Sequence, residues 1–151
     1  YDNSRLCEAM MRAGLRLGRD DYMRCGLTTL EWLMALQTAP AGHFRPIGSD
    51  SFSNDFAGPQ PFDQQPVEIW AAMDACLAAF DATSEPGWRD EASRAYEWFS
   101  GRNDRGVIVG DVESGTCHDG INPRGLNLNQ GAESVLAYQL AHCTLQRIGH
   151  A

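Results

Sequence analysis

The sequence has 151 residues, which is enough for one domain with its own core but not for several. Twelve basic residues, all arginine, stand against 20 acidic ones, and the net charge of -8 argues against nucleic acid or an anionic membrane as a partner, because both require clustered cations. No apolar run approaches the roughly 20 residues of a membrane helix. No secretory signal is visible, and because the chain begins at Tyr1 we expect a processed protein or a piece of a longer one.

The five cysteines indicate whether the protein binds a metal and in which cellular compartment it lies. Their number is odd, and no Cys/His pair has the spacing of a zinc site, so we expect neither a metal site nor a cofactor. Four of the five lie inside helical patterns, where cysteine behaves as a small buried hydrophobe: Cys7, Cys25, Cys76 and Cys143. This usage predicts a reducing, cytoplasmic compartment.

Apolar residues recur at helical spacing in five stretches of the chain. The first two stretches, 4–17 and 20–36, are separated by only a few residues including Gly18, which predicts an antiparallel hairpin of helices. A third helix begins at Pro66, a fourth contains Trp88 and Phe99, and a fifth covers about 132–148. The sequence therefore predicts an all-α domain built from helical hairpins.

Two long irregular segments, 38–64 and 103–130, interrupt the helices. Loops of that length inside a domain usually carry function, and here they follow each hairpin, so we expect a polar rim at one end of the helical body. Within them we expect at most a short two-stranded ribbon, formed by 107–109 pairing with 44–46. So few helices leave an open face, which we expect to pack against another domain or a second copy.

The residues Phe62–Glu68 form the first motif that could carry chemistry. Asp63, Gln64, Gln65 and Glu68 lie around a helix N-terminus, where a carboxylate is favoured and amides can bond free backbone groups. Helix capping explains the motif about as well as function does, although two successive glutamines exceed what a cap requires.

The second motif, Asn127–Ser134, precedes the last helix. Asn127, Asn129, Gln130 and Glu133 present paired donors and acceptors, which is the chemistry that sugar hydroxyls need. The alternative is an asparagine-rich turn whose carboxylate favours the helix dipole. Three amides and one carboxylate are more than capping needs, so we favour function.

Further candidates lie in the other loops. His118 and Asp119 could act as acid, base or ligand, although Asp-Gly is also a common turn sequence. A polar and aromatic cluster at the start of the chain and one turn of the first long loop complete the predicted substrate-binding rim: Tyr1, Asp2, Asn3, His43 and Phe44. Among the tryptophans, Trp70 and Trp98 are the candidates for stacking on a sugar ring.

Taken together and in order, these motifs resemble a known family. They are Tyr1-Asp2-Asn3, Gly42-His43-Phe44, Phe62–Glu68, Trp98–Asp104, Cys117–Gly120 and Asn129–Ser134. The series resembles the C-terminal helical-toroid domain of some bacterial glycosyltransferase-like proteins, within the six-hairpin glycosidase-like superfamily. The resemblance implies an α/α toroid whose loops form a sugar-binding cleft, of which this chain would supply an incomplete, C-terminal half.

Three functions remain open from the sequence. The first is glycoside processing by two carboxylates facing each other at about 5 to 10 Å, chosen from Asp63, Glu68, Asp119 and Glu133. The second is a non-catalytic sugar-binding or scaffolding module of a glycosyltransferase-like protein. The third is a helical assembly domain whose open face is an oligomer interface.

Overall fold

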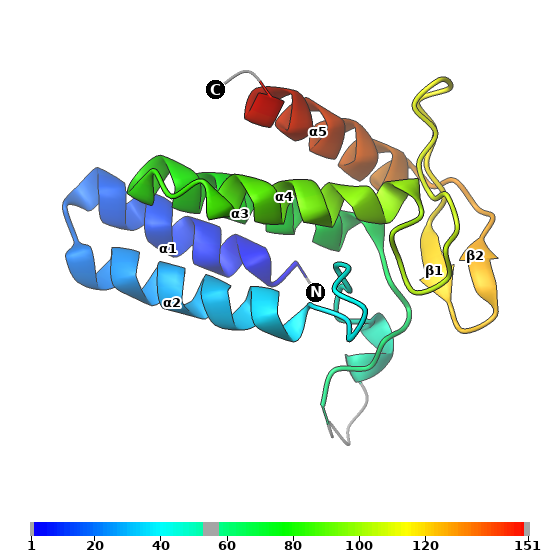
Figure 1. Cartoon of the computed structure of the whole chain (residues 1–151), viewed down its shortest axis with the longest axis horizontal. Coiled ribbons are helices and arrows are strands. Elements are labelled where there is room, and N and C mark those ends of the chain that lie inside the picture. Colours follow the sequence, from blue (N-terminus) through cyan, green and yellow to red (C-terminus); the bar gives the residue numbers. More distant parts are fainter. Residues whose placement is uncertain (1, 53–57, 150–151) are drawn as a thin grey trace.

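The computed structural model describes residues 2–52 and 58–149, and this part of the chain is mostly helical (Figure 1). Two short 3-10 turns, η1 (Ser49–Phe52) and η2 (Glu97–Ser100), lie between the longer elements. Within the described residues there are five α-helices: α1 (Ser4–Leu17), α2 (Asp20–Leu36), α3 (Pro66–Thr83), α4 (Gly87–Tyr96) and α5 (Ala132–Gly149).

The helix boundaries follow from residues that the sequence marks. Gly18 closes α1 in the left-handed conformation with φ 63°, and Pro66 occupies the first turn of α3. The fourth helix is shorter than its apolar pattern indicates. It narrows to a 3-10 turn after Tyr96, and Gly101 with φ 103° ends that turn. The prediction of a mostly helical domain made of hairpins is confirmed.

Helix α3 is the centre of the packing. The helices α1 and α2 form one antiparallel hairpin, α3 and α4 form a second, and α3 lies between α1 and α5 (Figure 1). Ile69, Met73 and Cys76 are fully buried, and five alanines of α3 are buried as well: Ala71, Ala72, Ala75, Ala78 and Ala79. Small side chains let neighbouring helices approach closely, so α3 is covered along most of its length.

The short ribbon lies at a different place from the predicted one. It consists of β1 (Gly120–Asn122) and β2 (Gly125–Asn127), which pair in antiparallel register. The segment 107–109 does not pair with 44–46, because Val109 donates its N–H to the carbonyl of Phe99 at 2.9 Å and Phe44 bridges to Thr38. The run of β-branched residues predicted a strand, whereas in the fold Val109 is buried in the core and Val107 packs against it.

The cysteines differ in part from expectation. All five thiols are free, and Cys7, Cys76 and Cys117 are buried. Cys25 and Cys143, however, are exposed, which corrects the prediction that the helical cysteines are buried. Helical periodicity assigns a residue to one face of a helix, but the residue is buried only if another element packs on that face.

Across 2–52 and 58–149, no helix has both the length and the apolar character needed to span a membrane.

A close contact joins β1 to the segment before α3. Gly120 has φ 136°, and a Cβ atom at this position would lie 2.0 Å from the carbonyl oxygen of Gln64. Only glycine allows both the backbone conformation and the approach. The contact holds the start of the ribbon against the start of α3.

We expect Gly120→Ala to lower the free energy of unfolding by about 2 kcal/mol or more, because it combines an unfavourable φ with a backbone clash. Gly87→Ala is the matched control, since Gly87 begins α4 and a Cβ atom added there would meet nothing within 4 Å apart from its chain neighbours and the backbone of its own helix. Urea denaturation of both variants measures the difference. Equal stability of the two variants would contradict the account of this contact.

Candidate functional site

A polar cavity of about 350 Å³ opens at the N-terminus of α5. Its volume lies at the lower end of the range of small-molecule sites, about 300 Å³ and upward. Three of the four carboxylates predicted as catalytic, those of Asp63, Asp119 and Glu133, line this one cavity. The other lining residues are Gln65, Asn127, Gly131, Ala132 and Ser134.

Asp119 is held firmly on one wall of the cavity. One carboxylate oxygen accepts the N–H of Gly131 at 2.6 Å, and the other accepts the side-chain amide of Asn129. Burial alone would raise the pKa of Asp119, but these bonds and one from the Ser134 hydroxyl outweigh it and keep the pKa below its ordinary value. Asp119 is therefore ionised at neutral pH, and it fixes the entrance of α5.

The pKa of Asp63 is shifted in the opposite direction. Burial raises its pKa, a hydrogen bond with Gln65 lowers it, and the nearby carboxylates of Asp50 and Asp119 raise it further, so that the pKa lies above its ordinary value. Two carboxyl groups with pKa shifts in opposite directions thus share the cavity. In sites that use two carboxyl groups, a difference between their pKa values lets the one with the higher pKa act as the acid and the other as the base.

The remaining lining adds hydrogen-bond donors. Ala132, Glu133 and Ser134 form the first turn of α5, where backbone N–H groups have no intrahelical acceptor. Gln65 and Asn127 contribute side-chain amides, which carry donors and acceptors. Among the described residues, no arginine lines the cavity. The site can therefore bond a ligand rich in hydroxyl groups, whereas the carboxylates oppose an anionic one.

Gln64 fixes the wall that carries Asp63. Its side chain is fully buried, and its carbonyl accepts the indole N–H of Trp98 at 2.8 Å. Its backbone N–H and carbonyl pair with Ile121 of β1, both at 2.9 Å. Because side chains alternate along an extended segment, a Gln64 that points inward leaves Asp63 and Gln65 facing the cavity.

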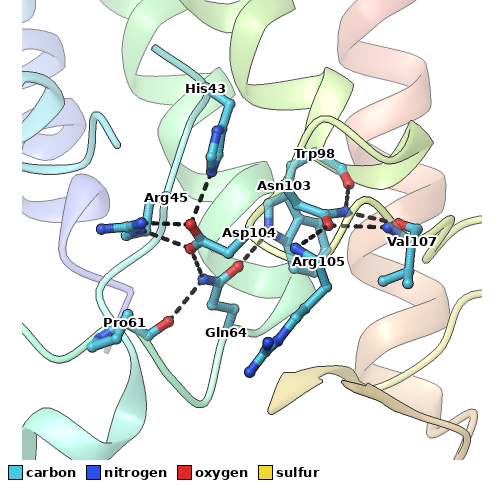
Figure 2. A network of polar contacts seen from close by, with 9 residues as sticks. All are labelled: His43, Arg45, Pro61, Gln64, Trp98, Asn103, Asp104, Arg105 and Val107. Carbon is cyan, nitrogen blue, oxygen red and sulfur yellow. Dashed lines mark hydrogen bonds and ion pairs between the residues drawn. The ribbon is translucent and has the colours of Figure 1, made fainter. Parts of the chain in front are cut away.

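The carboxylate of Asp104 anchors Gln64 in turn (Figure 2). It accepts the Gln64 amide at 2.5 Å, Nε of Arg45 at 2.7 Å and Nε2 of His43 at 3.1 Å. Burial would raise the pKa of Asp104, but the bonds from Arg45 and Gln64 outweigh it and lower the pKa. Asn103 shapes the loop by donating to the carbonyls of Trp98 and Val107.

Asp104 is not among the predicted site residues. It lies in the sequence Asn103-Asp104-Arg105-Gly106, which is typical of a turn. Its partners lie 40 to 61 positions earlier in the chain. The role of its carboxylate as a shared hydrogen-bond acceptor is therefore visible only in the fold.

Several predicted residues lie away from the cavity. Glu68 is 3% exposed in the first turn of α3, where it accepts the backbone N–H of Asp2, and burial raises its pKa. Asn3 lines a different groove, beside α1. None of these three residues lines the cavity that Asp63 and Asp119 share. Tyr1 lies outside the described residues.

The predicted substrate-binding residues of the first long loop stabilise the loop and do not line the cavity. Phe44 and Gln64 are fully buried, so the structure corrects the expectation that their side chains contact a ligand directly. Burial of an aromatic ring and of a fully bonded amide stabilises the loop instead. His43 points at Asp104 (Figure 2) and does not line the cavity.

The other loop and tryptophan candidates are also placed by the fold. His118 is half-buried next to Asp119 but does not line the cavity, and the exposed Gln130 lies 3.4 Å from the hydroxyl of Thr116. Trp98 is fully buried, and the ring of Trp70 lies 3.9 Å from the guanidinium of Arg5. Neither tryptophan presents a stacking surface in the cavity.

The helix-capping alternative for the first motif is not what the fold uses. Gln65 occupies the position before α3, and its side chain makes no capping hydrogen bond.

In the parts of the chain that the structure describes, no three His, Cys, Asp or Glu side chains are placed to hold a metal ion. A comparison with the models of known protein families finds no match, and a comparison with curated proteins finds none either.

We expect Asp104→Asn to lower the free energy of unfolding at pH 7 by about 2 kcal/mol or more, because it removes the charge that Arg45 and Gln64 bond. The folded-state pKa of Asp104 is lowered, so its stabilisation is present above the ordinary pKa of 3.8 and is lost as the pH falls through the folded value. The difference from wild type should therefore shrink in acid. Urea titrations at pH 7 and near pH 3 measure it.

Asp81→Asn serves as the control, because Asp81 is exposed on α3. Its effect should stay within about 0.5 kcal/mol at both pH values. A loss for Asp104→Asn that is equal at pH 7 and in acid would show that charge is not what holds this loop.

Proposed function

We propose that the cavity at the entrance of α5 binds carbohydrate. The observation that carries the proposal is the convergence of carboxylates, side-chain amides and a helix N-terminus on one cavity of about 350 Å³. A sugar hydroxyl both donates and accepts, so a ligand with several hydroxyl groups needs both kinds of partner. Asp63 and Glu133 supply acceptors, and Asn127 with the first turn of α5 supplies donors.

The charge of the lining favours a neutral sugar. Asp63, Asp119 and Glu133 contribute carboxyl groups, and no arginine among the described residues lines the cavity to balance them. A uronic acid or a sugar phosphate would bring a further negative charge into this field, which is unfavourable at short range. The chain as a whole has the same sign, with a net charge of -8.

A glycoside-processing role is part of the proposal and assigns different tasks to the carboxyl groups. Asp63, whose pKa is raised chiefly by burial, is the candidate to hold and deliver a proton. Glu133 lies exposed on the same cavity and is the candidate for the second carboxylate. Asp119 is less suited to react, since both of its oxygens already bond the protein.

Non-catalytic sugar binding is the second candidate, and one observation favours it. The carboxylate with the lowered pKa, that of Asp119, is used to hold the entrance of α5 rather than to face a ligand alone. A site whose ionised carboxylate is structural can bind a sugar without breaking a bond in it.

The toroid belongs to the proposal as well. The hairpins α1–α2 and α3–α4 repeat, and α3 lies between α1 and α5, an order that continues around a ring in an α/α toroid. The loops after each hairpin contribute Asp63, Asp119 and Asn127 to one site. These features, with the ordered motifs of the sequence, support an incomplete toroid of the glycosyltransferase-associated kind.

We expect neutral sugars to bind this cavity, and ligand-observed NMR with glucose, galactose, mannose and glucuronate tests this. At least one neutral sugar should give saturation transfer that Gln65→Ala and Asn127→Ala weaken, while glucuronate gives less. Asp90→Asn is the control, because Asp90 is exposed on α4 and does not line the cavity. Absence of binding by every sugar in the panel would contradict the proposal.

The same protein with 4-nitrophenyl glycosides separates the two candidates. If the site processes glycosides, wild type releases 4-nitrophenol, and Glu133→Gln, which removes the candidate second carboxylate, reduces the release by a factor of roughly 100 or more while keeping sugar binding. If the site only binds, wild type releases none, and binding by Glu133→Gln stays within a few-fold of wild type.

A further inference from the structure

The polar cavity at the entrance of α5 carries negative charge that its own lining does not balance. Asp63, Asp119 and Glu133 line it, and every other lining residue is uncharged. Carboxylates gathered in one small cavity repel each other, and a cation that joins them relieves this repulsion. A ligand for this cavity is therefore selected by its charge as well as by its hydroxyl groups.

Other half-buried carboxylates of the chain are paired with arginine. An arginine lies 2.7 Å from the carboxylate of Asp74, and another lies 2.5 Å from that of Asp104. Among residues 2–52 and 58–149, however, no arginine or histidine forms an ion pair with Asp63 or Asp119. The fold thus brings these two carboxyl groups together without supplying the cation that it supplies elsewhere.

Asp119 gives the cavity a lasting negative charge. Its oxygens accept the N–H of Gly131 at 2.6 Å and the side-chain amide of Asn129. Both donors are neutral, so they stabilise the ionised carboxylate without cancelling its charge. The field of Asp119 therefore acts on whatever enters the cavity beside it.

Asp63 adds an acceptor that has no donor in the described chain. Its Oδ1 atom is buried, and no described residue donates a hydrogen bond to it. A buried acceptor without a donor is unfavourable, and a ligand that brings an N–H group removes that cost. Rotation about χ2 of aspartate is soft, so this oxygen can turn toward the cavity that Asp63 lines.

A protonated primary amine matches these groups. It carries one positive charge and three hydrogen-bond donors, and it has no acceptor that a carboxylate would repel. Its bonds to carboxylates are charge-assisted and therefore stronger than those of a hydroxyl group. Glu133, exposed in the first turn of α5, presents a further carboxylate on the same cavity. The amides of Gln65 and Asn127 then serve the hydroxyl groups of the same ligand.

We infer that the ligand of this cavity is a sugar with a protonated amino group, which Asp63 and Glu133 bind as a cation. The inference rests on the proposed carbohydrate function and narrows it, because the charge that opposes an anionic sugar attracts a cationic one. A bare metal ion fits less well, since no three acidic, histidine or cysteine side chains of the described chain are placed to hold one.

The test compares four ligands by ligand-observed NMR titration of the 151-residue chain: glucosamine, N-acetylglucosamine, glucose and ethanolamine. At about pH 6.5 a sugar amine is mainly protonated, whereas acetylation removes the charge. We expect glucosamine to bind at least about fivefold more tightly than glucose or N-acetylglucosamine, since even one charge pair in water contributes about this factor. Raising the salt to about 0.5 M should reduce the preference, because charges are then screened.

Variants locate the amino group. Glu133→Gln and Asp63→Asn remove a charge at nearly constant size, and each should lower the preference for glucosamine over glucose at least about threefold. Binding of glucose itself should stay within a few-fold of wild type. Glu85→Gln is the matched control, because Glu85 is exposed between α3 and α4 and does not line the cavity. Circular dichroism of each variant verifies the helical content.

The possible failures separate the inference from the function on which it rests. Glucose binding without any preference for glucosamine would overturn the inference and leave the carbohydrate function standing. A preference that Glu85→Gln lowers as much as Glu133→Gln would also overturn it, because the net charge of the chain would then be the cause. Ethanolamine binding as tight as that of glucosamine, or no binding by any of the three sugars, would contradict both.

Discussion

The buried amide of Gln64 and the half-buried carboxylate of Asp104 meet at 2.5 Å, and the loop region depends on this contact. Gln64 also bonds Trp98 and pairs with Ile121 through its backbone. One residue thereby joins the segment before α3, the turn after η2 and the strand β1. An unpaired amide at this depth would be costly, so the three segments keep one arrangement.

The electrostatics of the polar cavity follow from that arrangement. With Gln64 directed inward, Asp63 and Gln65 face the cavity, and the pairing of Gln64 with Ile121 brings Asp119 to the same place. Hydrogen bonds to Asp119 lower its pKa and keep it ionised. The pKa of Asp63, in contrast, is raised by burial and by its charged neighbours. The same backbone connection thus creates both the proximity of the two carboxyl groups and the difference between them.

The helical body positions the loops without taking part in the polar chemistry. Helix α3 is covered by α1, α4 and α5, and its alanines allow this close packing. The hairpin of α1 and α2 is covered on one side only, and its other side keeps Leu6 and Trp32 in solvent. The molecule therefore has two surfaces of opposite character, a polar cavity at the loop end and an apolar groove along the first hairpin.

The sequence by itself determined the helices, because helical periodicity, Gly18 and Pro66 act locally. It also indicated Asp63, Asp119 and Glu133, since carboxylates at turns and helix entrances are visible in the residue order. Only the tertiary structure decided that these three share a cavity and that Glu68 lies apart from it. The role of Asp104 was decided there too, because partners 40 or more residues away leave no local pattern. The place of the ribbon also depends on a distant segment, since Ile121 of β1 pairs with Gln64.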